Sequence, residues 1–84
     1  MLKNTTKPPK KSDTQFIQGQ TFISPEQAFQ EAINDGILSN QLHDINYAGN
    51  FMYMWTQGKV HHFKSITTRK YGYNLKTIIE ASKN

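Results

Sequence analysis

The stretch that decides the fold is Asn-Phe-Met-Tyr-Met-Trp-Thr-Gln-Gly-Lys-Val-His-His-Phe-Lys-Ser-Ile, residues 50–66. Two runs rich in aromatic and apolar residues flank the pair Gln57-Gly58, a pattern typical of a β-hairpin with a two-residue turn. The stretch also holds the only tryptophan and two of the three methionines of the chain. We therefore predict a central antiparallel ribbon that supplies much of the core, the binding surface, or both.

The predicted turn determines which ribbon residues share a face, because Thr56 then lies opposite Lys59. One predicted face holds Phe51, Tyr53, Trp55, Val60, His62, Lys64 and Ile66. The other holds Met52, Met54, Thr56, Lys59, His61, Phe63 and Ser65. Both faces carry apolar residues, whereas a sheet over a single core has one apolar and one polar face. Either both faces are covered, which we favour for so short a chain, or one face stays exposed for a partner.

An amphipathic helix is predicted upstream of the ribbon, over about residues 25–35. Ser24 is a favourable N-cap residue, and Pro25 suits the first helical position. Gln27 completes a capping-box pattern with Ser24. Gly36 can adopt the left-handed conformation that often ends a helix. The apolar stripe of this helix follows helical spacing and consists of Ala28, Phe29, Ala32 and Ile33.

A second helix is predicted at the end of the chain, over 75–82, with Asn74 as its N-cap. A short strand is expected near 20–23, after a glycine. These elements predict a small α+β domain over residues 15–84, in which the ribbon is packed by one helix before it and one after it.

Residues 1–14 read as a disordered basic arm, because they carry four lysines, one aspartate and two adjacent prolines but few apolar residues. The 84-residue chain has no cysteine, which excludes a disulfide framework and a thiolate metal site. It also has neither an apolar run long enough to span a membrane nor the apolar segment of a secretory signal. A cytoplasmic location, with no membrane association, is therefore expected.

The charge pattern suggests an anionic partner. The acidic residues from Glu26 to Asp44 precede the ribbon, whereas Lys59 and the later cations up to Lys70 lie within or after it. Aromatic rings bordered by cations can stack bases and hold phosphates of single-stranded nucleic acid. The residues predicted to form this binding site are Tyr53, Trp55, Lys59, His62, Lys64, Arg69, Lys70 and Tyr71.

Catalysis and metal binding have weaker support. His43, His61 and His62 are the only histidines, and adjacent residues on a strand point to opposite faces. No Gly-x-Ser-x-Gly elbow or glycine-rich phosphate loop occurs. We therefore expect no metal site, no cofactor and no enzymatic activity.

A protein partner remains the alternative to nucleic acid. Methionine and aromatic side chains on the ribbon are typical of adaptable interfaces. The same residues would serve a protein–protein interaction module, a small inhibitor or regulator, or a homodimer.

Overall fold

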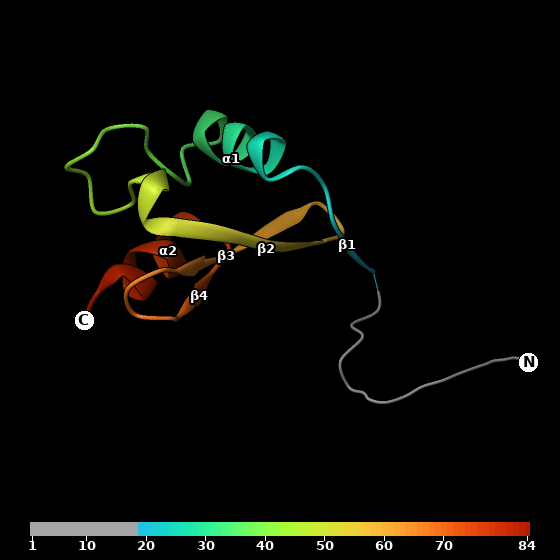
Figure 1. Ribbon diagram of the computed structural model, residues 1–84. Helices are drawn as coiled ribbons and strands as arrows, with labels where there is room; N and C mark the ends of the chain where they lie inside the picture. Colours follow the sequence, from blue (N-terminus) through green and yellow to red (C-terminus); the bar gives the residue numbers. More distant parts are fainter. Residues whose placement is uncertain (1–18) are drawn as a thin grey trace, which may run out of the picture.

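The computed structural model describes residues 19–84, which form a four-stranded antiparallel sheet with two helices (Figure 1). The strands lie in chain order across the sheet. The predicted α+β class is confirmed, and the predicted arm at 1–14 lies outside the described residues. The elements are β1 (Gln20–Thr21), α1 (Pro25–Asn34), the 3-10 turn η1 (Ala48–Asn50), β2 (Phe51–Gln57), β3 (Val60–Ser65), β4 (Tyr71–Gly72) and α2 (Leu75–Ser82).

Helix α1 forms where its local signals predict it. The Ser24 hydroxyl accepts a hydrogen bond from the Gln27 backbone N–H at 3.1 Å, and Pro25 stands in the first turn. The predicted capping box is only half formed, because the Gln27 side-chain amide donates to Glu31 at 3.0 Å instead. The chain leaves the helix through Gly36, whose φ of 77° is the left-handed conformation expected of it.

Helix α2 has a complete capping box at its start. The Asn74 side chain accepts from the Thr77 backbone N–H at 3.0 Å. The Thr77 hydroxyl accepts in turn from the Asn74 backbone N–H, also at 3.0 Å. Both exchanges satisfy donors that a helix start would otherwise leave without partners. Asn74 is therefore the N-cap, as predicted from the sequence.

Both helices pack on the same face of the sheet. Phe63 of β3 contacts Phe29 of α1, with ring centroids 5.1 Å apart. Gly72 of β4 pairs with Phe63, and a Cβ added to Gly72 would lie only 2.9 Å from the Ile78 Cα of α2. In Figure 1 α1 runs along β2, while α2 follows β4 toward the C-terminus. The buried core joins the two helices and the sheet through Ala28, Ala32, Leu38, Phe51, Phe63, Ile78 and Ala81.

Within residues 19–84 no helix covers the other face, which we call the open face. The expectation that both ribbon faces are covered is therefore wrong. Helix α2 joins α1 on the first face because Gly72 lacks a side chain and lets Ile78 approach the β4 backbone. The core can then close over one face alone, through the small residues Ala28 and Ala32 of α1 and Ala81 of α2.

The hairpin turn lies one residue later than predicted. Gln57 pairs with Val60, so the two turn residues are Gly58 and Lys59. Gly58 has a φ of 62°, which suits the first turn position of a type II′ hairpin. Only glycine adopts that conformation at little cost, so the register follows the glycine.

A β-bulge in β2 separates two aromatic residues that strict alternation places together. Tyr53 pairs with Phe63, but Trp55 pairs with the adjacent residue His62, so Met54 is an extra residue in β2. Tyr53 therefore lies on the covered face with Phe63, and Trp55 lies on the open face with His62. The predicted face that contained both Tyr53 and Trp55 is wrong. Along β3 the alternation holds as predicted.

Candidate functional site

The open face carries a row of aromatic rings across β2, β3 and the β4 region. Trp55 stacks on His62, with ring centroids 4.7 Å apart and planes inclined by 12°. Tyr71 meets Trp55 edge-on at 5.5 Å. Tyr73 lies tilted against His62 at 5.3 Å. We call Trp55, His62, Tyr71 and Tyr73 the aromatic row.

The members of the aromatic row differ in exposure. Trp55 and His62 are half-buried and cover each other's ring faces. Tyr71 and Tyr73 flank Gly72, which faces the core, so both phenols point to the open side. Their exposed fractions are 43% and 45%. The ring faces that a base can stack on are therefore those of the two tyrosines.

Cations accompany the row. The Lys64 Nζ lies 5.2 Å from the Tyr71 ring centroid, within range of a cation–π interaction. Lys59 is exposed in the β2–β3 turn, at one end of the sheet. Arg69 and Lys70 are exposed in the β3–β4 loop, at the other end.

Acidic side chains are confined to the other layer of the described chain. Glu26 and Glu31 lie on α1, and Glu80 lies on α2. Asp35 caps the end of α1, and Asp44 lies in the loop before η1. Among residues 19–84 the open face thus carries Lys64 and no carboxylate. The two layers differ in the sign of their charge.

The chemistry of two groups within the row is unusual. Burial lowers the pKa of His62 below its ordinary value of 6.5, and the charge of neighbouring His61 lowers this pKa further. The His62 ring is therefore neutral at pH 7. The Trp55 indole Nε1 is buried without a hydrogen-bond partner among the described residues. Buried indole N–H groups usually find an acceptor, so the row holds an unused donor.

The structure brings most of the predicted site residues to the open face or its ends. Trp55, His62, Lys64 and Tyr71 lie on that face, while Lys59, Arg69 and Lys70 lie in the loops at its two ends. Tyr53 is excluded, because the bulge turns it to the covered face. The predicted site omits other open-face residues, among them Met52 and Tyr73. The alternation Tyr71-Gly72-Tyr73 could have identified Tyr73 from the sequence.

Tyr53 instead belongs to a polar chain on the covered face. Its hydroxyl accepts from the Ile23 N–H at 3.2 Å and lies 2.6 Å from the Thr56 hydroxyl. Thr56 Oγ1 lies 2.9 Å from His61 Nδ1, and His61 Nε2 lies 2.7 Å from Glu31 Oε1. This polar chain thus connects Ile23, just before α1, to β2 and β3, and these strands to Glu31 in the middle of α1.

The donor and acceptor roles in this polar chain follow from the Glu31 carboxylate. Hydrogen bonds from Gln27 and then from His61 lower the pKa of Glu31, so the ionised carboxylate can only accept. His61 Nε2 must therefore donate to it, and in the tautomer that carries its proton on Nε2 the Nδ1 atom accepts from Thr56. Thr56 then accepts from Tyr53, and every group in the chain is satisfied.

This chain has the order of a hydroxyl–imidazole–carboxylate triad but lacks the exposure of one. A catalytic hydroxyl must reach the substrate. The exposed fraction of Thr56 is only 4%, and its hydroxyl is also bonded to Tyr53. The arrangement is therefore a buried tie between α1 and the hairpin rather than a nucleophile.

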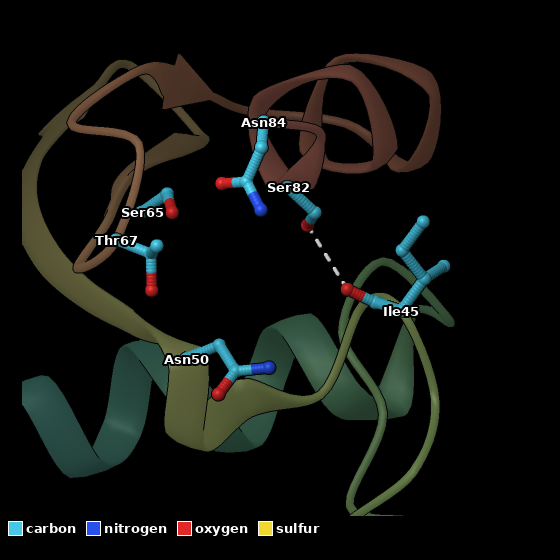
Figure 2. Close-up of a pocket in the computed structure, with 6 residues that line it drawn as sticks. All are labelled: Ile45, Asn50, Ser65, Thr67, Ser82 and Asn84. Carbon is cyan, nitrogen blue, oxygen red and sulfur yellow. Dashed lines mark hydrogen bonds between the residues drawn. The ribbon is translucent and has the colours of Figure 1, made fainter.

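A shallow depression on the covered side also lacks catalytic groups. Figure 2 shows it between η1, the β3–β4 loop and the end of α2. Its volume is about 220 Å³. Ser82 Oγ donates to the Ile45 carbonyl across it at 2.9 Å. The lining residues offer hydroxyl and amide groups but no acid, base or imidazole: Ile45, Asn50, Ser65, Thr67, Ser82 and Asn84.

Residues 19–84 also lack a metal-binding cluster and a membrane-spanning helix. Among residues 19–84 no group of three or more His, Cys, Asp or Glu side chains is placed to hold a metal ion. Neither of the helices in that range is long and apolar enough to cross a membrane.

No protein-family model, curated protein or solved structure matches this chain.

Proposed function

We propose that this protein is a non-enzymatic binding protein for single-stranded nucleic acid, with the open face as its binding surface. The observation that carries the proposal is the segregation of the two layers. Both helices and all carboxylates of the described chain lie on one side, and the aromatic row with Lys64 lies on the other. Exposed rings stack bases of any sequence, while cations beside them hold the phosphates.

The placement of the cations fits an extended strand rather than a duplex. Strand β3 has six residues; Lys59 precedes it, and Lys70 lies opposite its last residue, Ser65. Six extended residues span about 20 Å. A single strand crossing this distance can keep bases against Tyr71 and Tyr73 and phosphates near the cations. The described residues offer no helix on the open face that could enter a major groove.

The direct test is binding of labelled oligothymidylate and oligouridylate, followed by fluorescence anisotropy at low salt. If Lys59, Lys64, Arg69 and Lys70 all contact phosphates, affinity should fall roughly 50-fold between 50 and 200 mM salt. Tyr73→Ala should weaken binding by roughly 5- to 150-fold, because each stacked base contributes about 1–3 kcal/mol.

Matched variants distinguish a specific effect of open-face residues on binding from a general effect of charge or apolar surface. Lys64→Gln should weaken binding, whereas Lys83→Gln removes the same charge at the end of α2 and should not. Leu42→Ala alters an exposed apolar residue in the loop after α1 and should also leave binding unchanged. Absence of oligonucleotide binding at low salt, or equal losses in Lys64→Gln and Lys83→Gln, would contradict the proposal.

The alternative is a protein partner on the same face, either another protein or a second copy of the chain. Tyrosine and tryptophan are enriched at interface hot spots, which favours this use of the row. Self-association is disfavoured, because two copies would bring cations against cations. This alternative predicts no oligonucleotide binding but a discrete partner in a pull-down, lost in Tyr71→Ala. Sedimentation at increasing concentration reports a homodimer.

A further inference from the structure

His62 is the one member of the aromatic row that can gain a charge near neutral pH. It stands at the centre of the open face, between Trp55 on β2 and Tyr73 after β4. A neutral His62 provides only a ring, whereas a protonated His62 would add a cation between Lys59 and Lys64. The charge of the surface therefore depends on this side chain.

The neighbours of His62 show what opposes its protonation. On β2 it meets the uncharged Trp55, and on the β4 side it meets the phenol of Tyr73, with Tyr71 beyond. On β3 itself Lys64 follows two residues later on the same face, and His61 adjoins it on the covered face.

Among the described residues no carboxylate faces His62, since Glu31 is bonded to His61 on the opposite side of the sheet. Burial and the charge of His61 both lower the His62 pKa. A phosphate placed on the open face would supply the missing counter-charge.

We propose that His62 is a pH-dependent phosphate contact, so that the open face binds single-stranded nucleic acid more tightly as the pH falls below neutrality. The inference rests on the function proposed above and specifies its regulation. A bound phosphate stabilises the protonated ring, which raises the His62 pKa in the complex above its value in the free protein. Linkage then requires affinity to rise as the pH falls through the interval between the two values.

The test measures the affinity of the full chain for oligothymidylate between about pH 8 and pH 5, at constant ionic strength. A rise of one unit in the His62 pKa on binding corresponds to about a tenfold gain in affinity. His62→Gln should bind with less than about a twofold change over this range. His43→Gln, which removes a histidine from the exposed loop after α1, should keep the wild-type pH dependence.

A second measurement keeps the proposal testable if His62→Gln folds poorly. The His62 ring can be titrated by NMR in the wild-type protein, with and without oligothymidylate. Its pKa should rise on binding, whereas the ring signals of His43 should be unaffected by oligothymidylate.

The outcomes separate the two proposals. Binding with the same pH dependence in wild type and His62→Gln, or a His62 pKa unchanged by oligothymidylate, overturns the role of His62 alone. No binding at any pH overturns the proposed function, and the role of His62 with it.

Discussion

Replacement of Thr56 by valine tests the polar chain on the covered face. Valine has nearly the shape of threonine but lacks the hydroxyl that links Tyr53 at 2.6 Å to His61 at 2.9 Å. Thr56→Val therefore leaves the Tyr53 hydroxyl and His61 Nδ1 without the partner that they share. The site is shielded, since the exposed fraction of Thr56 is 4% and that of the His61 side chain is 13%.

The expected cost follows from these two groups. A buried polar group left without a partner costs about 1–3 kcal/mol. Tyr53 and His61 keep a small exposed fraction, so the lower part of that range applies to each, and Thr56→Val should lose about 2–3 kcal/mol. A domain of this size has a free energy of unfolding of roughly 3–10 kcal/mol. The substitution therefore removes a large share of the stability.

Urea denaturation followed by far-ultraviolet circular dichroism measures the loss. For a small domain with an m-value of about 1 kcal/mol per molar urea, the midpoint should fall by about 2–3 M. Thr67→Val is the matched control, because Thr67 is exposed in the β3–β4 loop and its substitution should change stability by less than about 0.5 kcal/mol.

A double-mutant cycle with Tyr53→Phe isolates the broken bond. Phenylalanine removes the O–H that Thr56→Val leaves without an acceptor, so the double variant should be about 1 kcal/mol more stable than the summed single losses predict. If Thr56→Val stays within about 0.5 kcal/mol of wild type, or the two losses simply add, the polar chain does not tie α1 to the hairpin.

Three further substitutions or conditions test other parts of the structure. Gly72→Ala should destabilise by about 1–3 kcal/mol, because its Cβ would meet the Ile78 backbone; calorimetry that finds no loss would show that α2 does not press on β4. Arg69 has a φ of 67°, so Arg69→Gly should stabilise by about 0.5–1 kcal/mol in the same assay, whereas a loss would mean that the Arg69 side chain matters more than its backbone strain. The folded-state pKa of Glu31 and of His62 is lowered, so each contributes stability above its ordinary pKa that is lost as the pH falls through its folded pKa. The melting temperature should therefore fall on acidification from pH 7. His62→Gln should remove the part of this fall that begins below pH 6.5, and Glu31→Gln the part that begins below pH 4.5. Unchanged acid sensitivity in both variants would contradict these assignments.

The chain's local signals determined most of its secondary structure. Ser24 and Asn74 begin the two helices as predicted, because an N-cap side chain needs only the backbone N–H groups of the next turn. The hairpin was also predicted correctly from the sequence. Its turn was misplaced by one residue, because Gly58 takes the first turn position rather than the second. Alternation along β3 correctly separated His61 from His62.

Only the tertiary structure decided which ribbon residues face solvent. The bulge at Met54 moves Tyr53 and Trp55 to opposite faces, and no feature of one strand alone reveals an extra residue relative to its partner. The placement of α2 beside α1 depends on the close approach of Ile78 to Gly72. The bond between Glu31 and His61 joins residues that are 30 positions apart. The sequence by itself thus determined the helices and strands, because their formation depends on neighbours along the chain. It also determined which aromatic and basic side chains are present. The open face exists because both helices pack on the other side of the sheet. Contacts between residues that are distant in the sequence determine that packing.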